Sequence, residues 1–381
     1  MEQLLRKYLS VLIRYSGSDL HLKSGSFVRI RVHGDLKQIK DQLSAEQLDQ
    51  LAREILSDIQ YAKLVENRTF DFTYILDQDN RFRVNFFYQM EGLSAVFRII
   101  PLKIPTIDEL KLPETVKSFT DIPRGLVLVT GVTGSGKSTT LAAIIGKINE
   151  TVPRHIITLE DPIEFVHQDK KCLINQRSVG QDALDFSGAL RAALREDPDI
   201  ILVGEIRDLE TVELALHAAN TGHLVFSTLH TLDAKETVNR VIGMFPQEEQ
   251  NRVRGTLASV LAGVISQRLV PIPNGGRRVV AEILVRTPRI VEMIAENRDL
   301  EIPDAVEEGK EIYGSQTFDQ HLLDLVDEQV ITEEIALEYA TKPSDLKLKL
   351  QGIGRGGAST SAEGSGASHL EAFEIKNEDN D

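Results

Sequence analysis

The spacing of apolar and polar residues predicts a small α+β unit at the start of the chain. Residues 27–36 and 81–90 alternate apolar and polar positions, which is typical of strands with one buried face. Residues 94–100 indicate a further strand, and helical patterns lie between these segments. We therefore expect an N-terminal α+β domain over residues 1–100.

A different pattern begins after a proline-rich stretch. Four prolines interrupt residues 101–123, which favours a linker because proline disrupts regular sheet pairing. Strands and helices then alternate; strands are expected at 125–131, 155–161, 199–205 and 223–230, and helices at 137–149, 185–197 and 208–222. This order predicts an α/β fold with a mostly parallel sheet covered by helices on both faces.

The last third of the chain is expected to be helical and then disordered. Residues 250–270 and 288–350 have mainly helical patterns, so we assign residues 124–350 to the second domain. Residues 351–381 are rich in glycine and serine and then acidic, a composition that cannot bury enough apolar surface to fold.

Composition narrows the function classes. The net charge of −15 argues against a protein that tracks nucleic acid, which gains affinity from lysine and arginine. The single cysteine, Cys172, excludes an internal disulfide framework and suits a reducing cytoplasm. No run of 18 or more residues is wholly apolar, and residues 1–15 have a helical apolar stripe without signal-peptide features. We expect no membrane-spanning helix.

The stretch "GVTGSGKST" at residues 131–139 fits the phosphate-binding pattern G-x-x-x-x-G-K-[ST] between a predicted strand and a predicted helix. Glycines let backbone N–H groups surround phosphate oxygens, the lysine reaches the β- and γ-phosphates, and the serine hydroxyl is placed to ligate Mg²⁺. The residues expected to bind ATP are Gly131, Thr133, Gly134, Ser135, Gly136, Lys137, Ser138 and Thr139.

Acidic residues follow two of the predicted core strands. Glu160, Asp161 and Glu164 lie close together after one strand, and their negative charges repel one another unless a cation or hydrogen-bond donors are near. Beside the phosphate-binding loop, this arrangement favours a metal site over a solvated turn. In "DIILVGEIRD", Gly204 occupies the position where many such enzymes have a metal-binding aspartate, and Glu205 follows it. Because ligands collect at the carboxyl ends of parallel strands, we expect Glu205 to join this acidic group.

Two histidines, His223 and His230, bracket the predicted strand at residues 223–230. A neutral imidazole at this edge is suited to hydrogen-bond an acid or to sense the γ-phosphate. The alternative is a purely structural role at the strand ends, and the sequence does not choose between the two.

Four segments in order resemble the motifs of secretion-superfamily ATPases, the hexameric motors of type II secretion and type IV pili. They are "GVTGSGKST" (Walker A), "ITLEDPIEFVH" (Asp box), "LREDPDIILVGEIRD" (Walker B) and "TGHLVFSTLH" (His box). In this family glycine precedes the Walker B glutamate. The resemblance implies a PAS-like N-terminal domain, a RecA-like ATPase domain, and Glu164 and Glu205 as the pair that positions water and Mg²⁺, with Ser138 as a second metal ligand.

The resemblance also implies a homohexamer in which ATP lies near a subunit interface. An arginine from outside the phosphate loop then stabilises charge on the transferred phosphoryl group. Arg81, Arg83 and Arg98, on strands of the N-terminal domain, are the candidates; the alternative is a solvated sheet face.

Within the family, residues 1–350 look most like PilT-type pilus retraction motors, which implies an inner-membrane platform protein as partner and a place at the cytoplasmic side of that membrane. A paralogous retraction ATPase is a further implied partner. One motif departs: Ala-Ile-Arg-Asn-Leu is replaced within "PRIVEMI", residues 288–294, where Val291 and Glu292 stand for the Arg and Asn. A PilU-type accessory role therefore remains open.

Three other functions share the phosphate loop. A RecA-like nucleic-acid translocase would have a basic channel, and we expect no nucleic-acid partner for so acidic a chain. A small-molecule kinase would need an acceptor pocket and a lid, and a nucleotide-gated structural protein would have negligible ATP turnover.

Overall fold

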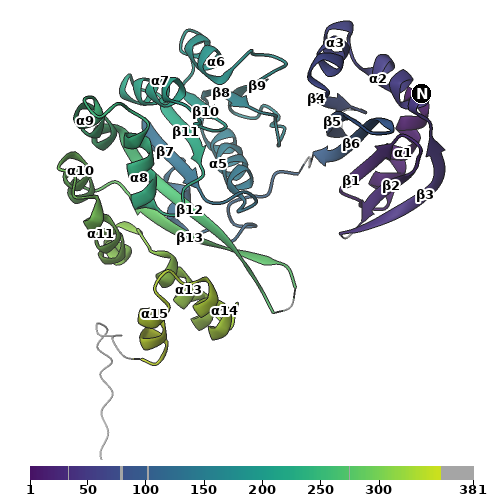
Figure 1. Ribbon diagram of the computed structural model, residues 1–381. Coiled ribbons are helices and arrows are strands. Elements are labelled where there is room, and N and C mark those ends of the chain that lie inside the picture. The colour runs from purple at the N-terminus through teal and green to yellow at the C-terminus, as the bar shows by residue number, and fades with distance from the viewer. Residues whose placement is uncertain (33, 78–79, 101–102, 274, 353–381) are drawn as a thin grey trace, which may run out of the picture.

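The computed structural model contains two separate β-sheets (Figure 1), and it describes all residues except 33, 78–79, 101–102, 274 and 353–381. Each sheet packs against its own buried apolar core. The α/β fold class with a mostly parallel second sheet is confirmed. Of the tail expected to be disordered, residues 353–381 lie outside the described residues. The domain boundaries stay a prediction.

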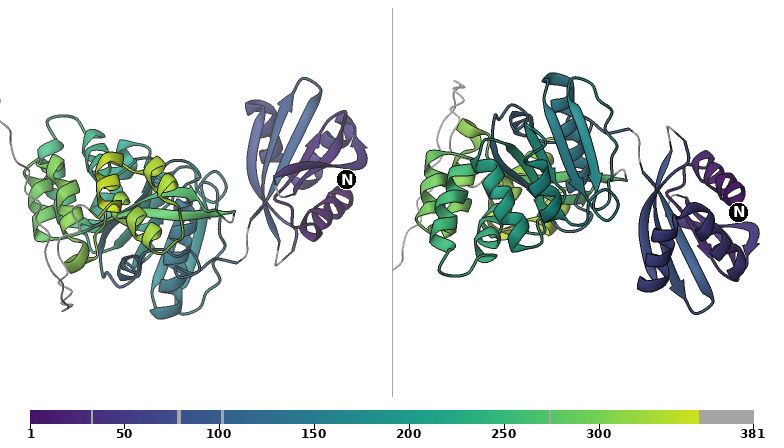
Figure 2. Two further views of the ribbon diagram at one scale, coloured as in Figure 1. Left: turned by 90° about the horizontal axis from the view of Figure 1, so that it is seen from below. Right: turned by 90° about the horizontal axis from the view of Figure 1, so that it is seen from above.

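The first sheet has six antiparallel strands in the order β3-β2-β1-β6-β5-β4. Its strands are β1 (Asp19–Lys23), β2 (Ser26–Val32), β3 (Asp35–Leu43), β4 (Thr69–Ile75), β5 (Arg81–Gln89) and β6 (Gly92–Ile100). Helices α1 (Glu2–Arg14), α2 (Ala45–Ile55) and α3 (Asp58–Asn67) lie on one side of this sheet (Figure 2). Alternate strand residues form one core with these helices, and the intervening residues make the opposite face polar.

The second sheet has seven strands in the order β13-β12-β7-β11-β10-β8-β9, all parallel to their neighbours except β13. The strands are β7 (Gly125–Thr130), β8 (His155–Glu160), β9 (Leu173–Ser178), β10 (Ile200–Val203), β11 (Leu224–Leu229), β12 (Leu261–Pro271) and β13 (Arg277–Val285). The carboxyl ends of β7, β8, β10 and β11 meet at one edge. This is the edge where ligands bind in open α/β sheets.

Helices cover both faces of the second sheet, as its uniformly buried central strands require. Helix α5 (Lys137–Thr151) and the short α4 (Thr115–Ser118) pack on one face. The other face is covered by α6 (Phe186–Ala193), α7 (Leu209–Asn220), α8 (Ala234–Gly243) and α9 (Gln250–Val260).

The helical prediction for residues 250–270 is wrong in its second half. Helix α9 ends at Val260, and β12 begins at Leu261. Residues 261–265 are all buried, and a short buried apolar run does not by itself distinguish a strand from a helix. Pairing with β7 on one side and β13 on the other makes this segment a strand. The sequence pattern did not predict β13.

The C-terminal helices form a layer in which those after residue 317 pack against the β12–β13 hairpin (Figure 1), whereas those over residues 288–308 pack mainly against α8 and α9. They are α10 (Pro288–Ala295), the 3₁₀-helix η1 (Asp299–Glu301), α11 (Ile302–Glu308), α12 (Lys310–Tyr313), α13 (Phe318–Asp327), α14 (Glu333–Tyr339) and α15 (Pro343–Leu350). Over the described parts of the chain, no helix combines the length and apolar character needed to cross a bilayer.

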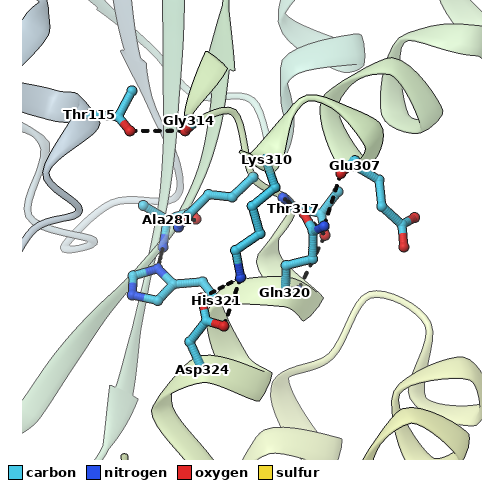
Figure 3. Close-up of polar contacts among 10 residues, drawn as sticks. Thr115, Ala281, Glu307, Lys310, Gly314, Thr317, Gln320, His321 and Asp324 are labelled. Carbon is cyan, nitrogen blue, oxygen red and sulfur yellow. Dashed lines mark hydrogen bonds and ion pairs between the residues drawn. The ribbon is translucent and has the colours of Figure 1, made fainter. Parts of the chain in front are cut away.

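Polar contacts join this layer to the sheet and to the stretch before it (Figure 3). The His321 Nδ1 atom accepts a hydrogen bond from the Ala281 N–H of β13 at 3.0 Å. The Thr115 hydroxyl of α4 donates to the Gly314 carbonyl at 3.0 Å. The C-terminal helices are therefore fastened both to the edge of the sheet and to the segment that leads into it.

Candidate active site

The loop between β7 and α5 forms a concave cradle. Gly131, Gly134 and Gly136 have positive φ angles of 139°, 80° and 95°, which favour glycine. A Cβ atom on Gly131 would lie 2.5 Å from the Gln267 carbonyl, whereas one on Gly134 or Gly136 would meet open space. The backbone therefore curls around an open volume at the start of α5, as phosphate binding requires.

Lys137, the first residue of α5, points back across this loop. Its Nζ donates to the carbonyls of Gly131 and Val132 at 2.9 and 3.1 Å. Burial lowers the pKa of Lys137, and the negative charges of Glu205 and Glu164 oppose that shift. The same two carboxylates predicted to act at the γ-phosphate therefore face this ammonium group.

Gly204 is required by close packing at the end of β10. A Cβ atom there would lie 3.1 Å from the Leu159 carbonyl oxygen and 3.3 Å from the Glu160 Cα, both backbone atoms of β8. The Gly204 N–H donates to Leu159, and its carbonyl accepts from the Thr228 hydroxyl, each at 2.7 Å. An aspartate at this position would press on the β8 backbone, and the acidic side chain enters one residue later.

Glu205 is held on both sides of its carboxylate. Oε2 accepts a hydrogen bond from Arg207 Nε at 2.8 Å, and Oε1 lies 3.3 Å from His230 Nε2. The Glu205 side chain is only 20% exposed. This geometry fixes the carboxylate at the carboxyl end of β10, beside the phosphate loop.

The acids after β8 differ in environment. Burial raises the pKa of Glu160, although Thr158 and Gln176 donate hydrogen bonds to its carboxylate. Glu164, four residues later, lines the same cavity. A buried carboxyl with a raised pKa thus lies next to the proposed catalytic glutamate.

These groups converge on one cavity of about 680 Å³. Most of the expected site residues line it. They belong to the phosphate loop, to the segments after β8, β10 and β11, and to the first sheet: Thr133, Gly134, Gly136, Lys137, Ser138, Thr139, Glu164, Glu205, His230, Arg83 and Arg98. Two further loop residues complete the cradle: Gly131 packs against β12, and Ser135 is buried with a hydroxyl that has no hydrogen-bond partner in the described structure.

Two of the arginines at the cavity come from the polar face of the first sheet. Arg83 and Arg98 are directly opposite each other on β5 and β6. Arg81 shares this face by strand alternation but does not line the cavity, and its Nε is buried without a partner among the described atoms. The structure thus brings two of the three candidate arginines to the nucleotide edge.

His223 lies away from this cavity, contrary to the expectation that both histidines share one edge. It precedes β11, whereas His230 follows it, so the two residues occupy opposite ends of the strand. The His223 Nδ1 contacts the Ala218 carbonyl at 3.0 Å. Its place is at the amino end of the parallel sheet, about 20 Å from the carboxyl end for a strand of this length.

Three residues were not singled out from the sequence: two that line the cavity and one that holds a lining residue. Arg207 pairs with Glu205, Gln176 of β9 holds Glu160, and Arg277 enters from the start of β13. Arg207 belongs to the Walker B segment and was within reach of sequence reasoning. The other two come from strands that the periodicity did not predict.

The donor set fits a magnesium–nucleotide substrate. Glycines without facing side chains leave room for phosphates, and a lysine and four arginines among the lining residues supply positive charge. In the described residues, no group of three acidic, histidine or cysteine side chains forms a metal cage. Mg²⁺ is usually held by one or two protein oxygens together with substrate phosphates, and the Ser138 hydroxyl and the Glu205 carboxylate lie at this cavity.

Comparison with known proteins gives the same family along nearly the whole chain. The family model described as "Type II/IV secretion system protein" matches residues 1–275. The type IV pilus retraction ATPase PilT of Pseudomonas aeruginosa is 48% identical over 342 residues, which cover 90% of this chain and 99% of the relative. The type IV pilus ATPase PilU of the same organism is 39% identical over 347 residues, covering 91% of each chain.

A crystal structure of the pilus retraction motor PilT with bound ADP has the same fold. It aligns with a TM-score of 0.84 at 44% sequence identity and covers 90% of this chain and 98% of the other. The ADP in that complex agrees with nucleotide binding by this family. Given the family match over most of its length, the chain belongs to the type II/IV secretion system protein family and is one of its ATPases.

Proposed function

We propose that this ATPase is a Mg²⁺-dependent hexameric motor that powers retraction of a type IV pilus by acting on a platform protein of the inner membrane. The observation that carries the proposal is the convergence of the phosphate loop, Glu164, Glu205 and His230 on one cavity, together with arginines of the first sheet. The full-length similarity to a relative named as a retraction ATPase supports the biological role.

In this proposal the phosphate loop and Lys137 bind the β- and γ-phosphates, and Glu205 with Glu164 orients the attacking water. The Ser138 hydroxyl and the Glu205 carboxylate are the groups that would hold Mg²⁺. The ion, when bound, neutralises charge on the phosphate oxygens. Arg83 and Arg98 place positive charge where negative charge develops during phosphoryl transfer.

ATP turnover is coupled to movement between the two sheets. Arg83 and Arg98 belong to the first sheet, and Lys137, Glu205 and His230 to the second, so both parts contact the same phosphates in this scheme. Loss of the γ-phosphate removes contacts that hold the parts together. The two sheets are joined through residues 101–123, and a change of angle there is the proposed power stroke.

A PilU-like accessory role is the second candidate, favoured by α10. Val291 packs against the main core and Glu292 pairs with Arg298 at 2.8 Å, so these positions are used for internal contacts. An accessory ATPase would hydrolyse ATP but depend on a partner motor for retraction.

The biochemical test is steady-state hydrolysis by Lys137→Ala, with Lys147→Ala as control, since Lys147 is exposed on the same helix. We expect turnover to be lost in the first variant and kept in the second. Normal turnover in Lys137→Ala would overturn the assigned site. The ring is tested by mixing wild-type subunits with Arg98→Gln subunits: inhibition beyond simple dilution would place this arginine at a neighbour's site.

The cellular test is deletion of the gene, followed by scoring of surface pili and twitching. Surplus pili without motility are expected for a retraction motor. Bald cells would indicate an extension motor instead. Loss of motility that is restored by excess of a paralogous ATPase would favour the accessory role.

A further inference from the structure

We propose that Asp19 is a positioning residue of the nucleotide site: its buried carboxylate holds the Arg98 guanidinium on the sheet face that borders the cavity. The inference rests on the proposed function in one respect, namely that Arg98 acts on the phosphates. Asp19 lies in β1, far from every ATPase motif in the sequence.

The register of the first sheet places Asp19 between two arginines. Asp19 is directly opposite Arg31 of β2 on one side and Arg98 of β6 on the other. Arg98 Nε donates to Asp19 Oδ1 at 2.7 Å, while Arg31 Nε lies 3.9 Å from Oδ2. The Ser18 hydroxyl donates to Oδ2 at 2.7 Å and sets the orientation of the carboxylate.

Burial of the pair is strongly asymmetric. The Asp19 side chain is 4% exposed, whereas that of Arg98 is 66% exposed. Burial alone raises the pKa of Asp19, but hydrogen bonds from Ser18 and Arg98 outweigh it and hold the pKa below its usual value. The acid therefore remains ionised beneath an arginine that lines the cavity.

Arg98 uses one edge of its guanidinium for this contact and keeps the rest available. Only Nε has a hydrogen-bond partner among the described residues. The terminal nitrogens suit bidentate contact with a phosphate, and Arg98 itself lines the cavity. A guanidinium fixed in advance loses less conformational freedom when it meets developing charge, which is the basis of electrostatic preorganisation.

Stability alone gives no strong reason for this arrangement. The cost of removing a carboxylate from water offsets much of the attraction to its partner, so a buried ion pair is weak evidence for stabilisation. Asp49 of α2 provides a comparison with the same kinds of partner but a more exposed side chain (39%): it accepts from the Tyr61 hydroxyl at 2.6 Å and from Arg53 Nε at 2.8 Å. That pair has the same chemistry but lies on the helix layer, away from the polar face.

The experiment compares Asp19→Asn, Asp49→Asn and Arg98→Gln in the full-length protein. Turnover number and KM for ATP are measured for each, with thermal unfolding recorded in parallel. We expect Asp19→Asn to lower kcat about three- to tenfold with KM changed less than twofold, because the contact serves the reaction more than ground-state binding. Asp49→Asn should keep wild-type kcat.

A double variant, Asp19→Asn with Arg98→Gln, shows whether Asp19 acts through Arg98. Its kcat should equal that of Arg98→Gln alone, since removal of the guanidinium leaves nothing to position. An additional drop in the double variant would indicate a general structural role and overturn the inference. If Asp19→Asn does not fold, Ser18→Ala replaces it, and we expect about a twofold loss of kcat that is absent in the Arg98→Gln background.

The outcomes separate this inference from the proposed function. Reduced kcat in Arg98→Gln together with wild-type kcat in Asp19→Asn would refute the role of Asp19 and leave Arg98 in place. Unchanged kcat in Arg98→Gln would remove Arg98, and Asp19 with it, from the mechanism. Unchanged kcat in Lys137→Ala would reject the site itself.

Discussion

Arg207 donates a hydrogen bond from Nε to the carboxylate of Glu205, two residues earlier, at 2.8 Å. The pairing leaves the second carboxylate oxygen directed to His230. The carboxylate raises the pKa of Arg207, and the guanidinium stays charged throughout the physiological range. Arg207 therefore fixes the orientation of the acid that we place at the γ-phosphate.

Replacement of Arg207 with alanine should lower kcat by about ten- to a hundredfold, since a hydrogen bond to a charged group is worth about 1.5–3 kcal/mol. The loss is expected in kcat because Glu205 acts in the reaction step. The control is Arg191→Ala, which breaks an exposed pair with Glu210 on neighbouring helices. Equal kinetics in the two variants would show that Arg207 does not orient Glu205.

Glu205→Gln should separate binding from hydrolysis. The amide keeps the shape of the side chain but cannot act as a base, so we expect kcat to fall about 10²–10⁴-fold. Affinity for a fluorescent ATP analogue should stay within a few-fold of wild type, since the phosphate loop is intact. Glu210→Gln is the control and should retain full activity. Substantial turnover in Glu205→Gln would show that another group activates water.

Gly204→Ala should destabilise the protein and reduce turnover. The added methyl group must displace backbone atoms of β8, and overpacking of this kind costs about 1–3 kcal/mol. Gly255→Ala has the opposite expectation: Gly255 lies in α9, a Cβ there meets open space, and alanine favours a helix by up to about 1 kcal/mol. Differential scanning calorimetry should show Tm shifts of opposite sign, and shifts of the same sign would contradict the packing explanation.

His321 should make stability fall in mild acid. Burial lowers its pKa from 6.5 to about 4, and Asp324, Arg278 and Lys310 are the charged groups facing it. Between these values the unfolded chain binds more protons than the folded chain, so the free energy of unfolding rises with pH over this interval. The contribution is complete above about pH 6.5 and is lost towards pH 4, by up to about 3 kcal/mol.

The check is chemical denaturation of His321→Gln between pH 4 and 7. Glutamine retains an acceptor for the Ala281 N–H but does not titrate, so the pH dependence should be flatter than in wild type. The control substitution is His217→Gln, at an exposed position of α7. An equally steep slope in His321→Gln would assign the acid sensitivity to other groups.

Much of the second sheet could be predicted because the residues that specify each of its elements lie within one short segment of the chain. The strand, glycine loop and helix around Lys137 are contiguous, so one short segment specifies both the shape of the cradle and its charge. The positions of Glu164 and Glu205 follow in the same way, since each lies within four residues of the end of a buried parallel strand. The position of His223 was also within reach, because a residue that precedes such a strand lies at the opposite edge.

Other features depend on partners that are distant in the chain. Residues 261–270 became a strand only through pairing with β7 and β13, and an apolar run by itself suits either structure. The sequence marked Arg83 and Arg98 as candidates without distinguishing them from Arg81, since the approach of one sheet to the other sets which side chains reach the cavity.

The sequence by itself determined the phosphate loop, the parallel sheet and the acids at its edge, because residues adjacent in the chain stay adjacent in the fold. The tertiary structure decided the need for glycine at position 204, the partners of Glu205 and the burial of Asp19 beneath Arg98. Each of these depends on strand register and on packing between separate elements, which local periodicity does not encode.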